Sequence, residues 1–226
     1  MGRSFRGTAL TILLALPWLA GSALAEAVPV RIVLFGDSYI SSHNVDPKLA
    51  FGVQLEAALN ANGPLVLVTS TGYTATAARG VARLESFLAT ESMLGGIGPK
   101  VVILELGSND CFRFKLEETQ ANLDAILKVL ADLKIPVLVA GTIPYTTCKQ
   151  RVRPDYDALY VQMFADLATK YGDLYYRDFK DGVGDHPELM QDDRDHPTAE
   201  GDAVIVAKIR PVVEMLVARA QLPAMK

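Results

Sequence analysis

Short apolar runs alternate with longer amphipathic segments along the chain. Residues 30–36 (VRIVLFG) are rich in β-branched apolar side chains and end at Gly36. A run of this length and composition is typical of a strand buried on both faces, as in a parallel sheet. Further short apolar runs predict strands at residues 65–68, 101–106, 136–140 and 174–176.

The longer segments show helical spacing. Between residues 116 and 133, apolar side chains recur at intervals of three and four, at Leu123, Ile126, Leu127 and Leu130. This is the pattern of a helix with one buried face. The same reasoning predicts helices at residues 48–61, 75–88, 156–171 and 198–220. For residues 48–61, the expected buried face consists of Leu49, Val53, Leu55 and Leu59.

Strands that alternate with helices imply βαβ units, and therefore a parallel sheet with helices on both faces. The chain contains no internal repeat, low-complexity tract or long linker. The sequence thus predicts one doubly wound α/β domain over residues 26–226.

The first 25 residues have a different character. Arg3 and Arg6 form a short basic region, an apolar stretch follows at residues 9–20, and Ala23-Leu24-Ala25 supplies an A-x-A cleavage pattern. This is the layout of a secretory signal peptide. The alternative, an uncleaved anchor, requires a longer apolar run to span a bilayer. We therefore expect residues 1–25 to be removed and the protein to be periplasmic or secreted, with no stable membrane anchor.

Composition narrows the range of partners. Half of the residues are hydrophobic and 21% are charged, as in a globular protein with a sizeable core. Without Arg3 and Arg6, 20 basic residues remain against 26 acidic residues, a net charge of about −6. With no basic stripe visible, nucleic acid is not an expected partner. Export leaves two alternatives open for Cys111 and Cys148: a disulfide or two free thiols.

Polar residues gather where the predicted strands end. The segments are Gly36-Asp37-Ser38, Ser70-Thr71-Gly72-Tyr73, Gly107-Ser108-Asn109-Asp110 and, before the last helix, Asp192-Asp193-Arg194-Asp195-His196-Pro197. In open α/β sheets, sites form beyond the carboxyl ends of the strands. We therefore expect these four segments to lie together.

Their side chains suit acyl transfer. A serine hydroxyl such as that of Ser38 is a weak nucleophile unless a neighbouring base takes its proton, and His196 can be that base. The base needs a carboxylate on its other ring nitrogen, and Asp193 can turn back onto it from three residues away. Asp192 and Asp195 compete for this role. The side chain of Asp195, next to His196, is expected to point elsewhere, where it can cap the last helix at Pro197.

A tetrahedral intermediate also needs donors directed at its oxyanion. The candidates are the backbone N–H groups of Ser38 and Gly72 and the side-chain amide of Asn109. Gly72 suits this role because the absence of a Cβ lets an oxyanion approach the backbone.

Four segments together resemble the motif blocks of the SGNH (GDSL-type) hydrolase family, in family order and spacing. They are Phe35-Gly36-Asp37-Ser38-Tyr39, Ser70-Thr71-Gly72-Tyr73-Thr74, Leu106-Gly107-Ser108-Asn109-Asp110 and Asp193-Arg194-Asp195-His196-Pro197. The chain is most similar to the small exported bacterial branch of multifunctional esterases, thioesterases, arylesterases and lysophospholipases. The resemblance implies a flavodoxin-like three-layer α/β/α domain with five parallel strands and no cofactor. It also selects Asp193 as the third member of the triad.

Each segment taken alone has a plainer interpretation. Asp37 and Ser38 can cap a helix, Asn109 and Asp110 can be turn residues, and Gly72 can mark a tight turn. His43 and His186 are expected to be ordinary loop residues. No Cys or His cluster has metal-ligand spacing, so no metal is predicted.

The sequence therefore predicts a serine hydrolase of acyl or aryl esters or thioesters, with a small acyl-ester or lipid-like substrate, lysophospholipids included. Apolar residues near strand ends can line an acyl pocket or belong to the core: Leu106, Phe112, Phe114, Ile143 and Tyr145. The alternatives are a carbohydrate O-acetylesterase of the cell envelope and a non-catalytic envelope binding protein on the same scaffold.

Overall fold

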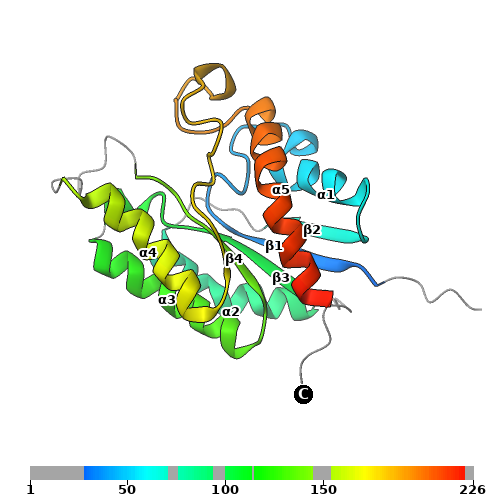
Figure 1. The fold of residues 1–226 in the computed structure, drawn as a ribbon, viewed down its shortest axis with the longest axis horizontal. Coiled ribbons are helices and arrows are strands. Elements are labelled where there is room, and N and C mark those ends of the chain that lie inside the picture. Colours follow the sequence, from blue (N-terminus) through cyan, green and yellow to red (C-terminus); the bar gives the residue numbers. More distant parts are fainter. Residues whose placement is uncertain (1–27, 71–75, 94–99, 114, 145–153, 222–226) are drawn as a thin grey trace, which may run out of the picture.

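The computed structural model describes residues 28–70, 76–93, 100–113, 115–144 and 154–221 (Figure 1). Its sheet has five parallel strands in the order β2-β1-β3-β4-β5. The strands are β1 (Val30–Gly36), β2 (Val66–Ser70), β3 (Lys100–Glu105), β4 (Val137–Ala140) and β5 (Leu174–Tyr176). This order is that of flavodoxin-like folds, with a topological switch point between β1 and β3. The predicted fold class is confirmed.

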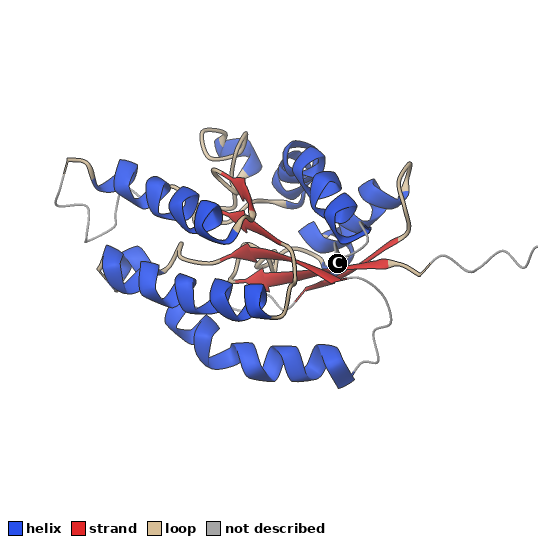
Figure 2. Cartoon of the chain, turned by 60° about the horizontal axis from the view of Figure 1, so that its bottom comes forward, coloured by secondary structure: helices blue, strands red, loops and turns tan. Residues whose placement is uncertain are grey.

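Helices cover both faces of the sheet (Figure 2). Two of them, α1 (Phe51–Asn60) and α5 (Ala199–Gln221), pack together on one face. The opposite layer is formed by α2 (Ala77–Met93), α3 (Leu116–Asp132) and α4 (Tyr156–Tyr171). Short 3-10 helices lie at Pro47–Leu49, Asp110–Phe112 and Pro187–Leu189.

Strand β1 shows why the first apolar run is continuous. Ile32 and Leu34 belong to the core under α1 and α5, whereas Val33 and Phe35 belong to the core under α2, α3 and α4. Successive side chains of a strand point to opposite faces, so a strand covered on both sides carries apolar residues towards both. The exception in β1 is Arg31, a buried charged residue near its amino end. All seven residues of β1 are buried.

The segment predicted as one helix at 48–61 is divided. Pro47–Leu49 forms a 3-10 turn that begins at Asp46, whose carboxylate accepts the Lys48 N–H at 2.9 Å. Ala50 is extended, so α1 begins only at Phe51. The prediction that Leu49 and Val53 are buried is wrong, since both are 50% exposed. The buried face of α1 consists of Phe51, Leu55 and Leu59, which are spaced by four.

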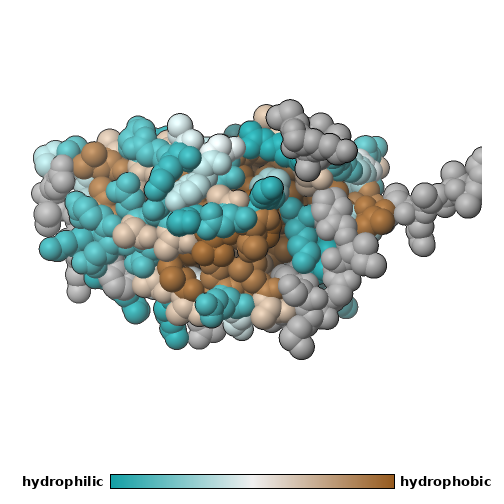
Figure 3. All heavy atoms as spheres, turned by 90° about the horizontal axis from the view of Figure 1, so that it is seen from below, coloured by the Kyte–Doolittle hydropathy of each residue, from teal (hydrophilic) through white to brown (hydrophobic). Residues whose placement is uncertain are grey.

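An apolar hollow in the described residues lies away from the predicted chemistry. Its volume is about 400 Å³, and its lining is mainly apolar: Val33, Phe87, Leu88, Ala89, Lys100, Val102, Leu133 and Ile135. Apolar side chains gather on the face seen in Figure 3. Lys100 is the first residue of β3, so this hollow lies towards the amino ends of the strands, whereas the candidate site residues follow their carboxyl ends. In the described residues, no helix is long and apolar enough to cross a membrane.

Candidate active site

The switch point places Ser38 beside the segment that follows β3. Gly36 pairs with Glu105 in the register between β1 and β3, so the loops after the two strands start side by side. Gly36 is required at this close approach. A Cβ there would stand 2.3 Å from the Glu105 carbonyl oxygen and 2.6 Å from Ile40.

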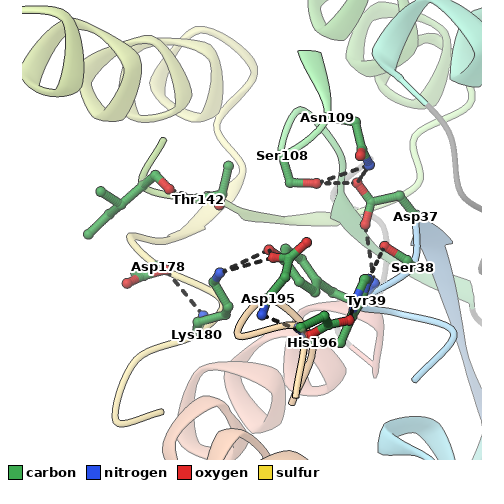
Figure 4. Close-up of polar contacts among 12 residues, drawn as sticks. Asp37, Ser38, Tyr39, Ser108, Asn109, Thr142, Asp178, Lys180, Asp195 and His196 are labelled. Carbon is green, nitrogen blue, oxygen red and sulfur yellow. Dashed lines mark hydrogen bonds and ion pairs between the residues drawn. The ribbon is translucent and has the colours of Figure 1, made fainter. Parts of the chain in front are cut away.

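Ser38, His196 and Asp193 form one hydrogen-bonded chain. Ser38 Oγ lies 2.9 Å from His196 Nε2, although 158 positions separate the two residues (Figure 4). On the other side of the ring, His196 Nδ1 lies 2.8 Å from Asp193 Oδ2. Hydroxyl, imidazole and carboxylate thus stand in the order that proton transfer from Ser38 requires.

The turn that carries His196 is closed by its own backbone. Met190 forms an antiparallel bridge with Pro197, and the Gln191 N–H donates to the His196 carbonyl at 2.8 Å. Within the turn, Asp193 Oδ1 accepts the backbone N–H groups of Asp195 at 2.9 Å and His196 at 3.0 Å. These bonds hold the Asp193 side chain in an orientation in which its other oxygen, Oδ2, contacts the His196 ring.

The same contacts determine the charge of Asp193. Partial burial acts to raise its pKa, but the bonds from the His196 ring and from the backbone N–H groups of His196 and Asp195 outweigh it. The pKa of Asp193 is lowered to about 2. Asp193 is therefore ionised over the whole neutral range, as the partner of a ring that gains a proton must be.

A second carboxylate, Asp37, organises the residues after β3. Asp37 Oδ2 accepts the Asn109 Nδ2–H at 2.9 Å and the Ser108 hydroxyl, and Oδ1 accepts the Tyr39 N–H at 3.2 Å. Figure 4 shows the Asn109 amide nitrogen turned towards Asp37 and Ser108. Asp37 does not cap a helix, because the next α-helix begins at Phe51.

Asp37 is fully buried, with Glu105 as a buried neighbour. Burial raises the pKa of Asp37 to about 6, against the hydrogen bonds from Ser108 and Asn109. Burial and the adjacent charge of Asp37 raise the pKa of Glu105 well above its usual range. The raised pKa favours the protonated form of Glu105, and Asp37 keeps acceptor oxygens for Asn109 and Ser108.

Several residues that the sequence suggested for the site or its pocket lie outside the described residues or belong to the core. Gly72, the third expected oxyanion donor, lies outside the described residues, as do Phe114, Tyr145 and Cys148. Leu106 belongs to the core on the α2, α3 and α4 side. Cys111 is buried and disulfide-bonded.

The sequence interpretation missed other residues around His196. His43 was expected to be an ordinary loop residue, but its ring centroid lies 4.8 Å from that of His196. His186 is exposed and pairs with Glu188 at 3.0 Å. Nothing in the spacing of the three histidines along the chain distinguishes His43. Its contact with His196 depends on where the tertiary fold places the turn at 190–197.

The expectation that Asp195 caps the last helix is wrong. Thr198 Oγ1 accepts the Gly201 N–H at 3.1 Å in the first turn of α5. Asp195 Oδ1 instead accepts the hydroxyl of Tyr39 at 2.6 Å, with Lys180 Nζ 3.7 Å away. The only signal in the sequence was adjacency: Tyr39 follows Ser38, and Asp195 precedes His196.

A model of the GDSL-like lipase/acylhydrolase family matches residues 34–204. The chain is 25% identical over 200 residues to esterase TesA of Pseudomonas aeruginosa, a match that covers 84% of this chain and 91% of that protein. The crystal structure of TesA has a TM-score of 0.72 at 24% identity and covers 83% of this chain and 99% of that one. The SGNH-hydrolase family esterase AlinE4 has a TM-score of 0.66 at 29% identity and covers 86% of this chain and 98% of that one.

Proposed function

Since the chain belongs to the GDSL-like lipase/acylhydrolase family and is a carboxylic ester hydrolase, we propose that it works through an acyl-enzyme on Ser38. The proposal is carried by one observation, the hydrogen-bonded chain from Ser38 through His196 to Asp193, with distances of 2.9 and 2.8 Å. It requires no cofactor, because the side chains themselves supply nucleophile, base and carboxylate.

In the acylation step, His196 Nε2 takes the hydroxyl proton as Ser38 Oγ attacks the carbonyl carbon. Asp193 accepts the Nδ1–H of the ring, so Nε2 is the free acceptor in the resting state and the imidazolium is stabilised once formed. His196 then gives its proton to the leaving alcohol or thiol as the carbon–oxygen or carbon–sulfur bond breaks. In the deacylation step, a water molecule attacks the acyl carbon while His196 takes its proton. The ring then gives this proton to Ser38 Oγ as the ester bond to the enzyme breaks and the acid leaves.

The negative charge of the tetrahedral intermediate needs hydrogen-bond donors. We assign this role to the backbone N–H groups of Ser38 and Gly72 and to the Asn109 amide. The bond from Asn109 Nδ2 to Asp37 supports the assignment, because it orients the amide beside the residue that precedes Ser38.

We propose short-to-medium acyl esters, aryl esters and thioesters as substrates, and lysophospholipids as a further class. We also propose that residues 1–25 are a signal peptide and that the enzyme acts in the periplasm or outside the cell. Mass spectrometry of the intact protein recovered from outside the cytoplasm should give the mass of residues 26–226, with Glu26 as the first residue.

The decisive experiment compares the wild type with Ser38→Ala on p-nitrophenyl esters of rising chain length, alongside labelling by a fluorophosphonate. Ser38→Ala should abolish labelling and nearly all turnover, and His196→Ala should abolish nearly all turnover. Parallel assays on acetylated xylan separate an acyl esterase from a carbohydrate O-acetylesterase. Wild-type protein with no Ser38-dependent turnover and no labelling would be a binding protein, and the proposal would fail.

A further inference from the structure

The residues next to the nucleophile and next to the base are bound to each other. Tyr39 follows Ser38, Asp195 precedes His196, and the Tyr39 hydroxyl donates to Asp195 Oδ1 at 2.6 Å (Figure 4). The Ser38–His196 bond therefore has a parallel link one residue away on each side. Hydrogen bonds to ionised acceptors are shorter and roughly twice as strong as neutral ones.

Lys180 completes the link from a third segment. Its Nζ donates to the Tyr39 hydroxyl oxygen at 2.9 Å and lies 3.7 Å from Asp195 Oδ1 and 4.8 Å from the Tyr39 ring centroid. The Lys180 side chain is only 13% exposed. Its backbone is held in turn by Asp178, whose Oδ1 accepts the Lys180 N–H at 3.1 Å.

The anchor of this arrangement is rigid. Tyr39 is 1% exposed, and its ring stacks on Phe179 with centroids 6.2 Å apart. The bonds within the turn at 190–197 determine the shape of that turn, but they do not determine its distance from Ser38. Tyr39–Asp195 crosses between the two segments, and so does Gln191, whose Nε2 donates to the His43 carbonyl at 2.6 Å.

We propose that Tyr39, Asp195 and Lys180 form a clamp that holds His196 at its working distance from Ser38. This inference rests on the proposed function of Ser38 and His196, and it makes the three residues positioning residues. Its physical basis is the sensitivity of acyl transfer to geometry, since a displacement of about 1 Å can cost about 100-fold in rate. The hydroxyl of Tyr39 has two partners here, Asp195 and Lys180, so its loss removes two bonds and leaves only the 3.7 Å ion pair between Lys180 and Asp195.

The chain contains a matched control. Tyr171, Asp124 and Lys170 form the same trio: Tyr171 Oη lies 2.9 Å from Asp124 Oδ1, Lys170 Nζ lies 2.6 Å from the same oxygen, and Lys170 stands 5.1 Å from the Tyr171 ring centroid. This trio joins α3 to the end of α4, just before the amino end of β5. It has the residue types of the clamp, with Lys170 bound to the carboxylate, but it lies at the opposite end of the strands.

The test measures kcat, KM and Tm for Tyr39→Phe, Asp195→Ala, their double variant and the control Tyr171→Phe, on a p-nitrophenyl ester. We expect Tyr39→Phe and Asp195→Ala each to lower kcat about tenfold, with KM within about twofold of the wild type. The double variant should be no slower than the slower single variant, because both changes remove one link. Tyr171→Phe should leave kcat unchanged.

Conservative rescue separates positioning from general stability. Asp195→Asn keeps an oxygen that accepts from Tyr39, so it should retain most of the kcat that Asp195→Ala loses. Asp195 has a side chain that is 37% exposed, so its variants should fold even if Tyr39→Phe does not. The clamp is refuted if Asp195→Ala keeps kcat within about twofold, if Asp195→Asn is as slow as Asp195→Ala, or if the effects in the double variant multiply. Failure of the proposed function would look different, since Ser38→Ala would then keep the wild-type rate.

Discussion

Two aspartates hold side chains near Ser38: Asp193 binds the ring of His196, and Asp37 binds the amide of Asn109. The two carboxylates differ in solvent exposure and in pKa. Asp193 has a side chain that is 43% exposed, and three hydrogen bonds keep its pKa at about 2. Asp37 is 0% exposed, and burial raises its pKa to about 6 although it accepts three hydrogen bonds as well. Solvent contact and a partner ring that gains a proton favour charge, whereas full burial opposes it.

The two environments suit two tasks. In the proposed mechanism, the base side of the site, with Asp193, depends on a permanent negative charge that stabilises the imidazolium of His196. The proposed oxyanion side, with Asp37, depends on the orientation of the Asn109 amide, for which an acceptor oxygen is enough. Substitutions that remove charge but preserve shape should therefore be severe on the base side and mild on the oxyanion side.

The largest expected effect is on the base side. Asp193→Asn should lower kcat by about 10³–10⁴, because the ring loses the carboxylate that holds its tautomer and charge. Asp195→Asn, two residues away in the same turn, should stay within about threefold of the wild type. Steady-state kinetics on one ester decides between them, and the reverse order of effects would transfer the triad role to Asp195.

Truncation on the oxyanion side should come next. Asn109→Ala should lower kcat by about 10²-fold with a smaller change in KM, since a bond to the oxyanion strengthens in the transition state. The control is Asn122→Ala on α3, where an exposed amide of the same type donates to the Glu118 carbonyl at 2.9 Å. An equal rise in KM with kcat preserved would show that Asn109 binds substrate and does not stabilise the transition state.

A smaller effect is expected at Asp37 itself. Asp37→Asn keeps an acceptor oxygen for Asn109, so kcat should fall only about tenfold, far less than in Asp193→Asn. Rates for both variants measured side by side test the comparison directly. A loss as large as that of Asp193→Asn would mean that the charge of Asp37 itself is needed.

The smallest effect concerns stability against pH. Asp193, with a pKa lowered to about 2, stabilises the fold above its ordinary value of 3.8, and this contribution is lost as the pH falls through 2. Buried Asp37 and Asp202, with pKa values raised to about 6 and about 7, act in the opposite sense. Their contribution is complete below 3.8 and is lost as the pH rises through 6 and 7.

The free energy of unfolding should therefore be higher near pH 4 than at pH 8. Urea denaturation across this range measures the slope. Asp202→Asn should reduce the difference in unfolding free energy between pH 4 and pH 8 by about 1 kcal/mol or more, because the amide carries no charge to bury. Asp166→Asn, on the exposed side of α4, should leave it unchanged. A free energy of unfolding that rises towards pH 8 in the wild type would contradict the raised pKa values.

Some elements could be predicted from local pattern alone. The strand at 30–36 and the helix at 156–171 have the expected boundaries, because their ends coincide with a Gly or with the change of hydrophobic period. The helix expected at 48–61 failed because apolar residues at helical spacing do not reveal which of them meets the core. Leu49 precedes α1, and the extended residue Ala50 separates it from the helix. Val53 is two residues from both Phe51 and Leu55, so it lies on the opposite, solvent-facing side of α1.

The sequence by itself determined which elements form and which polar residues follow the strand ends, since both depend on local spacing and on the direction of the chain. Only the tertiary structure decided what each of those residues meets. Tyr39 and Asp195 are 156 positions apart, and His43 lies against His196 through no local rule. The pKa of Asp37 was decided there too, because its burial and its partners Ser108 and Asn109 come from segments that are distant along the chain. The partners of Asp193, in contrast, lie two and three residues away in the same turn.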